Sequence, residues 1–236
     1  MKLMDLNYAD IKDYMETIND SLIIPVGTCE QHGSHLPVGT DTKVAEYMAD
    51  ILSTETGILI TPTVNYGVNL PCDRLMNGTA SITEETLRDT LGSIISWWQA
   101  QGFKAFIIIT CHGDPFHIRA LTNLGPDILC LEPEGEIDYS DILESQDCIR
   151  HACEAETSIA LYLFPELVKM EKIKEYDIVY TDFEPYLFHK IIKQPAGYAG
   201  SLGYPSFASR EKGEAILSRM KDYMFNEYRE FIKIYD

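Results

Sequence analysis

The chain alternates between short apolar runs and longer stretches in which apolar and polar residues repeat with a helical period. The apolar runs predict strands at residues 21–26, 58–61, 103–110 and 128–131. The run at 103–110 is nearly all apolar, as expected for a central strand covered on both faces. The amphipathic stretches predict helices at residues 7–18, 42–55, 84–101 and 209–232. Strands that alternate with helices indicate an α/β fold with a mostly parallel sheet and helices on both of its faces.

Polar residues and glycines mark the expected helix boundaries. Thr83 is expected to cap the third helix, and Glu84 is favourably placed in its first turn. Gly57 and Gly102 are expected to end the second and third helices. No internal repeat, low-complexity tract or obvious linker interrupts the 236 residues, so we expect a single domain over residues 1–236.

Charge and hydropathy narrow the choice of partners. The chain has 37 acidic and 19 basic residues and a net charge of −18, which repels nucleic acid and anionic membranes. No apolar run approaches the roughly 20 residues of a membrane span. The N-terminus lacks the basic start and apolar centre of a secretory signal, so we expect a cytoplasmic protein. The acidic stretch at residues 132–147 is interpreted as a solvated loop or rim, with a mouth that attracts cations as the alternative.

Cysteine chemistry is the less favoured route to catalysis. The six cysteines form no CxxC pair, and a chain of this length without an export signal favours reduced, partly buried thiols. Cys29 and Cys111 each precede a candidate ligand, and a small apolar residue at a strand end is the favoured interpretation of both. A cysteine-dependent amidase that uses Cys111 is kept as a third hypothesis.

The strongest chemical pattern follows the first predicted strand. Residues 25–41 have the sequence PVGTCEQHGSHLPVGTD and place Glu30, His32, His35 and Asp41 in a loop rich in glycine and proline. Imidazole nitrogens and carboxylate oxygens suit Zn, Mn, Fe or Ni, and the glycines allow sharp turns. We therefore predict a divalent metal site and, from it, an enzyme. Capping of the following helix is the structural alternative for Asp41.

Three further segments carry candidate ligands or proton carriers. The strand at 103–110 is followed by His112 and Asp114, and the segment HACEAETS contains His151 and Glu156. The third segment, GYAGSLGYPSFAS, is a glycine-rich loop able to approach a ligand closely. Because ligands bind at the carboxyl ends of parallel strands, the loops after the first and third strands are expected to converge.

Together these motifs resemble the creatininase-like family of metal-dependent amidohydrolases. The resemblance rests on EQHGSHLPVGTD, on a strand followed by a histidine loop, on HACEAETSIALYLFPELV, and on GYAGSLGYPS before the last helix. These motifs span nearly the whole chain in the family's order. The resemblance implies a three-layer α/β/α sandwich, a site for two divalent metal ions (Zn, Mn or Fe), a small-molecule substrate and a homo-oligomer, commonly a hexamer.

The resemblance also implies a role for each ligand. Glu30 and His112 would hold one metal ion, and His32 would hold the other. Asp41 would bridge the two ions. Glu156, which matches the glutamate of the third motif, is favoured as the further carboxylate of the second ion.

Two assignments stay open. Asp114 is the alternative carboxylate for the second metal ion, although a solvated loop is its favoured interpretation. The acid that protonates the departing nitrogen is His151 or His35, and His35 alternatively orients a ligand. His117 and His189 are interpreted as packing or surface residues, and a buried histidine bonded to backbone is the structural alternative for the ligands.

The expected activity is hydrolysis of a non-peptide C–N bond in a small cyclic amide or formamide by a metal-activated hydroxide. Most relatives carry an Asn-Gly-His-Gly-Gly-Asn type of turn where residues 110–115 have TCHGDP, and Pro115 removes a backbone N–H. Trp97 and Trp98 lie on a predicted helix rather than at positions suited to creatinine, so creatinine is not the expected substrate. The alternatives are a catalytically impaired metal-binding homologue and a formamide deformylase of a pyrimidine or flavin-pathway intermediate.

Overall fold

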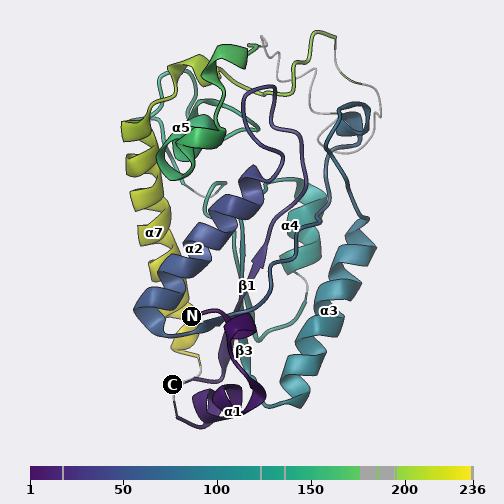
Figure 1. The fold of residues 1–236 in the computed structure, drawn as a ribbon, viewed down its shortest axis with the longest axis vertical. Coiled ribbons are helices and arrows are strands. Elements are labelled where there is room, and N and C mark those ends of the chain that lie inside the picture. Colours follow the sequence, from purple (N-terminus) through teal and green to yellow (C-terminus); the bar gives the residue numbers. More distant parts are fainter. Residues whose placement is uncertain are drawn as a thin grey trace.

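A parallel β-sheet forms the centre of the molecule (Figure 1). The computed structural model describes residues 1–17, 19–122, 124–135, 137–175, 185, 194 and 196–234. Within them, the strand order is β2-β1-β3-β4, with bounds Ser21–Val26 for β1, Leu59–Ile60 for β2, Ala105–Thr110 for β3 and Ile128–Leu131 for β4. Every pairing is parallel, which confirms the predicted sheet. β2 is shorter than predicted because only its two residues pair with β1, at the edge of the sheet.

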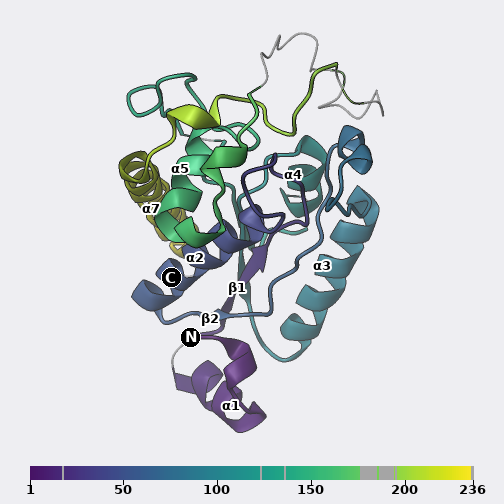
Figure 2. The same cartoon turned by 45° about the horizontal axis from the view of Figure 1, so that its top comes forward.

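Helices cover both faces of the sheet, so the fold is a three-layer α/β/α sandwich (Figure 1 and Figure 2). One face carries α2 (Thr40–Thr56), α5 (Glu154–Leu163) and α7 (Arg210–Ile232), and the other carries α1 (Tyr8–Thr17), α3 (Glu84–Ala100) and α4 (Pro115–Thr122). Alternate strand residues enter the two cores, with Ile23, Ile107 and Ile109 on the first face and Leu22, Phe106 and Ile108 on the second. Short 3-10 turns lie at Leu3–Asp5, Pro71–Leu75, Pro165–Leu167, Met170–Lys172 and Pro205–Phe207.

The predicted helix caps are confirmed. The Thr83 hydroxyl accepts a hydrogen bond from the Thr86 backbone N–H at 3.1 Å at the start of α3. At the start of α7, the Ser209 hydroxyl accepts a hydrogen bond from the Lys212 backbone N–H. Gly57 ends α2 in the left-handed conformation with φ of 75°. These local signals fix where the long helices begin and end.

The helix α4 was not predicted, and it changes the interpretation of Asp114. The Asp114 carboxylate caps α4 by accepting hydrogen bonds from the backbone N–H groups of Phe116 (2.7 Å) and His117 (3.2 Å). Pro115 is the first residue of α4, where a missing N–H costs nothing. Asp114 is 5% exposed, so the solvated-loop interpretation was wrong.

The carboxyl ends of β1, β3 and β4 meet at one edge of the sheet because the strands are parallel. The loops after these strands and the start of α5 gather at this edge. None of the helices in the described residues is long and apolar enough to cross a membrane.

Candidate metal centre

The loop after β1 folds back on itself and buries its polar side chains. Gly33 adopts φ of 64°, a left-handed conformation that lets the chain turn directly after His32. At Gly27 an added Cβ would lie 2.5 Å from the Cα of Thr42, so only glycine allows the end of β1 to pack against the first turn of α2. That close approach brings Asp41 of α2 beside the loop.

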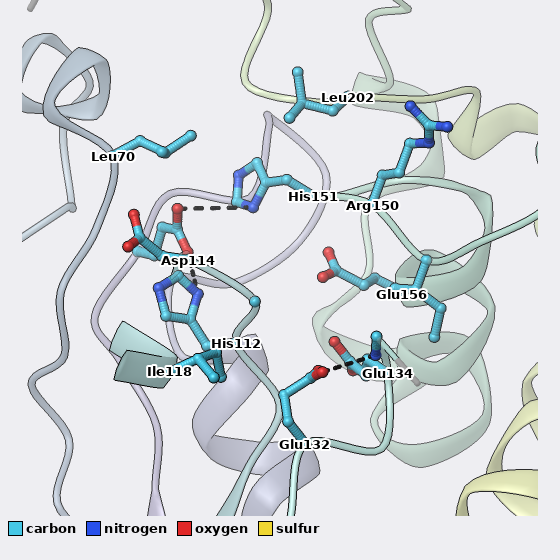
Figure 3. Close-up of a pocket in the computed structure, with 14 residues that line it drawn as sticks. Leu70, His112, Asp114, Ile118, Glu132, Glu134, Arg150, His151, Glu156 and Leu202 are labelled. Carbon is cyan, nitrogen blue, oxygen red and sulfur yellow. Dashed lines mark hydrogen bonds and ion pairs between the residues drawn. The ribbon is translucent and has the colours of Figure 1, made fainter. Parts of the chain in front are cut away.

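Two triads of ligand atoms share one carboxylate. Within the described residues, the side chains of Glu30, Asp41 and His112 form one triad, and those of His32, Asp41 and Glu156 form another. In each triad the ligand atoms lie within 4.8 Å of one another. All five residues are at least nine-tenths buried. The triads are built from the loop after β1, the first turns of α2 and α5, and the loop after β3, and Figure 3 shows His112 and Glu156 on opposite sides of the pocket.

Backbone carbonyls fix which histidine nitrogens face the carboxylates. His112 Nε2 donates to the Val68 carbonyl at 2.7 Å, which leaves Nδ1 3.0 Å from Glu30 Oε2 and 3.6 Å from Asp41 Oδ2. His32 Nδ1 donates to the Glu30 carbonyl at 3.1 Å, which leaves Nε2 2.8 Å from Asp41 Oδ1 and 3.6 Å from Glu156 Oε2. In a neutral imidazole the second nitrogen carries a lone pair, and a lone pair beside a carboxylate needs a cation or a proton between them.

The pKa values show how the cluster holds protons when no cation compensates it. Burial lowers the pKa of His32, but Asp41 overrides it and raises that pKa to about 10. Burial raises the pKa of Glu156 to about 8, with Asp41 and Glu30 adding to the effect. Burial opposes the shift at Glu30, but His151 and His112 hold the pKa of its carboxyl well below the usual range. Protons and divalent cations therefore compete for the same atoms, as at metal sites whose filling releases protons.

The donor set fits divalent metal ions. Asp41 Oδ2 is fully buried and accepts no hydrogen bond within the described part of the chain. A buried carboxylate oxygen without a donor is costly unless it coordinates a metal. The imidazole nitrogens of two histidines and the oxygens of three carboxylates are ligands that suit Zn, Mn or Fe. The shared position of Asp41 suits a carboxylate that bridges two ions.

The structure places Asp41, Glu156 and Asp114 in different surroundings. The residue before α2 is Gly39, which makes no side-chain capping bond, so capping is not the role of Asp41. Glu156 lies in a triad, and its Oε2 also accepts a hydrogen bond from the Ala152 backbone N–H. Asp114 joins none of the triads formed by the described residues, and its carboxylate caps α4 instead.

The histidines outside the two triads have distinct environments. His151 lines the cavity that contains Glu30, His112 and Glu156, and with Glu30 and His32 it forms a third candidate triad. His35 is buried, and its Nε2 lies 2.9 Å from the Thr157 hydroxyl, beside Glu156 on α5. His117 is buried and packs edge-on against His112, with ring centroids 4.8 Å apart, as expected for a packing residue. His189 lies outside the described residues.

Gln31 is a site residue that the sequence patterns did not single out. Its Oε1 accepts a hydrogen bond from the Gly33 N–H at 2.9 Å, which turns the amide nitrogen toward His151 Nε2 (2.9 Å). The same nitrogen lies 3.0 Å from the Tyr198 hydroxyl and 3.2 Å from Asp73 Oδ1. Because Gln31 donates to Nε2, His151 carries its own proton on Nδ1, 3.8 Å from Glu30 Oε1. Gln31 was missed because a single uncharged amide inside a metal motif gives no signal of its own.

The glycine-rich loop holds these parts together rather than standing apart as a ligand loop. Gly200 has φ of 87°, and a Cβ there would lie 2.2 Å from Gln31 Oε1. The Leu202 N–H donates to the His151 carbonyl at 2.7 Å, and the Ser201 hydroxyl donates to the Ala152 carbonyl at 2.8 Å. The loop therefore fixes both the metal motif and the segment that carries His151.

A cavity of about 240 Å³ opens above the triads. Its lining includes Glu30, His112, His151 and Glu156 from the candidate centre, together with Leu70, Gly113, Asp114, Ile118, Glu132, Glu134, Gly135, Ile149, Arg150 and Leu202. The acidic stretch was interpreted as a solvated loop, but Glu134 is 6% exposed and forms part of the cavity wall. Cys111 is 1% exposed, and burial raises the pKa of its thiol well above the usual range, which argues against a catalytic thiolate.

Comparisons with known proteins agree with this geometry. A family model described as creatinine amidohydrolase matches residues 4–227. The 3-dehydro-scyllo-inosose hydrolase of Thermotoga maritima is 27% identical over 91% of this chain and 78% of that protein. The 2-amino-5-formylamino-6-ribosylaminopyrimidin-4(3H)-one 5'-monophosphate deformylase of Methanococcus maripaludis is 26% identical over 91% of this chain and 83% of that protein. A solved structure of creatininase with Mn covers 97% of both chains with a TM-score of 0.77 at 22% identity, which shows a shared fold.

Proposed function

The chain belongs to the creatininase family of metal-dependent amidohydrolases. On this premise, we propose that its two triads bind two divalent metal ions and that the protein hydrolyses a small cyclic amide or formamide. Glu30 and His112 would hold one ion, His32 and Glu156 would hold the other, and Asp41, which belongs to both triads, would serve both ions. The observation that most strongly supports this proposal is that Asp41 belongs to both buried triads. Zn, Mn or Fe suits these ligands, and the solved creatininase with Mn supports that choice.

The metal ions, when bound, supply polarisation of a carbonyl oxygen and hydroxide near neutral pH. The chain's own residues orient the substrate and move protons. His151 lies on the cavity wall with a proton on Nδ1, and we assign it the transfer of a proton to the departing nitrogen. Burial lowers the pKa of His151 to about 4, so the ring is neutral near pH 7 and the proton that it can give is the one on Nδ1. His35 is not among the described residues that line this cavity, which supports an orienting role for it through Thr157.

Elemental analysis of untagged protein tests this proposal. We expect about two equivalents of a transition metal in the wild type and a sharp reduction in Glu30→Ala, because the Glu30 carboxylate lies with Asp41 and His112 in one group of candidate ligands and with His32 and His151 in another. Glu55→Ala, an exposed change on α2, is the matched control and should retain the metal. One equivalent in the wild type would indicate a mononuclear site, and no metal after reloading with Zn, Mn and Fe would contradict the proposal.

A substrate screen follows once the metal is present. The panel includes lactams, formamides such as the substrate of the Methanococcus maripaludis relative, and 3-dehydro-scyllo-inosose, after which the Thermotoga maritima relative is named. A metal-dependent rate that is lost in His32→Ala would support hydrolysis by this centre. Retained metal without turnover across the panel would instead indicate a catalytically impaired homologue.

Gln31 is expected to position His151, which gives a separate prediction. Gln31→Leu removes the hydrogen bond to His151 Nε2 while keeping a side chain of similar size. We expect kcat/KM to fall about 10- to 100-fold with metal content unchanged, as for other residues that orient ligands from behind. Gln99→Leu on the exposed side of α3 is the control and should have no effect. A normal rate in Gln31→Leu would show that His151 is positioned by other contacts.

We also propose that the protein is a cytoplasmic homo-oligomer, with a hexamer as the family's common assembly. The strongly acidic composition supports a location away from anionic membranes. Light scattering after size-exclusion chromatography tests the assembly, and a monomer at micromolar concentration would contradict it.

A further inference from the structure

The cavity contains one carboxylate that neither the metal triads nor the protein's own hydrogen bonds account for. Glu134 is more than nine-tenths buried, and none of the hydrogen bonds identified among the described residues involves its carboxylate. It lines the cavity on the same side as Glu156, across from His112 (Figure 3). A buried carboxylate is normally paired or hydrogen-bonded, so its missing partner is expected in whatever fills the cavity.

Two hydrogen bonds hold the described part of the loop that carries Glu134. It follows β4, so it lies at the same edge of the sheet as the metal motif and His112. The Glu132 carboxylate accepts a hydrogen bond from the Gly135 N–H at 2.8 Å, which closes the turn around Glu134. The hydroxyl of the fully buried Tyr139 donates to the Pro133 carbonyl at 3.0 Å from the other side. These contacts use Glu132 for the turn and leave Glu134 to face the cavity.

The charges around the cavity determine which group suits Glu134. Glu132 and Asp114 line the same cavity, so an anionic group placed beside Glu134 would meet several negative charges. Among the described residues, Arg150 is the one lysine or arginine in the lining, and it lies beside Leu202 in Figure 3 and 3.8 Å from Asp147. A positively charged N–H donor gains both a hydrogen bond and the attraction of these carboxylates, whereas a neutral hydroxyl gains the hydrogen bond alone.

We propose that Glu134 is the substrate-recognition residue of this centre and receives a positively charged amino or amidino group carried by the substrate. The proposal rests on the proposed function, because the metal centre must hold the scissile carbonyl while Glu134 holds the charged end. It defines the substrate as a cationic amide or formamide and excludes one with an anionic group at the same position.

Binding of hydroxamates tests the proposal without turnover. The hydroxamate group chelates the metal ions, and the group at the other end of the molecule contacts the cavity wall, so its effect on affinity can be measured. Hydroxamates of two chain lengths that end in an ammonium, methyl, hydroxyl or carboxylate group are titrated into the metal-loaded protein by calorimetry. We expect the ammonium compound to bind at least about tenfold more tightly than the methyl compound in the wild type. Glu134→Gln should abolish that preference, and Glu134→Lys should transfer it to the carboxylate compound. Glu214→Gln, an exposed change of the same charge on α7, should behave as the wild type.

The outcomes distinguish this proposal from the function on which it rests. An ammonium preference that persists in Glu134→Gln, equal binding of the hydroxyl and ammonium compounds, or tightest binding of the carboxylate compound would overturn the role of Glu134 while the metal centre stands. Failure of every hydroxamate to bind a protein that also lacks metal would contradict the proposed function itself. Because charge reversal predicts a gain of binding for one compound, misfolding of a variant cannot imitate the expected result.

Discussion

Replacement of Asp41 by alanine is expected to remove both metal ions and to lower kcat/KM by at least about a thousandfold. Asp41 Oδ1 lies 2.8 Å from His32 Nε2, and Oδ2 lies 3.6 Å from His112 Nδ1, so each oxygen serves a different triad. Of the other carboxylates, Glu156 contributes to one of the two triads, and Glu30 contributes to the other and to the group with His32 and His151. Loss of the shared carboxylate therefore leaves two incomplete pairs of ligands, neither of which is expected to retain an ion.

Metal analysis and kinetics on the same preparation check this prediction. Asp50→Ala is the matched control, since Asp50 lies on the same helix with a side chain that is 52% exposed and should retain metal and activity. Glu156→Ala provides a second comparison, because it should lose mainly one ion. If Asp41→Ala kept about two equivalents of metal and a near-normal rate, the bridging role and the assignment of both triads would be wrong.

The fold was predictable because each strand and each long helix has a local pattern of its own. Residues 105–109 are all apolar, and Thr83 and Gly57 mark helix ends through local contacts and backbone geometry. The helix α4 was missed because its capping residue, Asp114, follows a metal-like histidine and its first residue is proline. A carboxylate can bind a metal ion or accept hydrogen bonds from the first backbone N–H groups of a helix, and the sequence does not show which of these lies nearer to Asp114.

The candidate site was predictable where its ligands are contiguous and less so where the topology assembles them. Glu30, His32 and Asp41 lie within one loop and the next helix, so their spacing alone suggested a common centre. Gln31 gains its role only because the glycine-rich loop, distant in sequence, places Tyr198 against it. Glu134 looked like one more residue of an acidic surface run until the position of β4 turned it into the cavity wall. Burial, which distinguishes a functional carboxylate from a solvated one, depends on contacts that a single sequence does not display.

Removal of the metal ions is expected to lower the melting temperature by at least about 10 °C, and reloading should restore it. Glu30, Asp41 and Glu156 are all buried within the two triads, and without cations their mutual repulsion must be relieved by protons. Ligand linkage contributes about 4 kcal/mol for an ion at a thousand times its dissociation constant, and each kcal/mol moves the melting point of a domain of this size by about 2–4 °C.

Calorimetric scans of wild type and of Asp41→Asn, each with chelator and with added Zn or Mn, check this prediction. The metal-free Asp41→Asn variant should melt at a lower temperature than the metal-free wild type, because the buried His32, 2.8 Å from Asp41, loses its charged partner. The same variant should gain little from added metal. A wild-type protein that melts within about 2 °C with and without chelator would show that the carboxylates are already neutralised by other means. The cluster would then be a protonated hydrogen-bond network, in which the raised pKa values of His32 and Glu156 describe the working state of the site rather than the state that metal replaces.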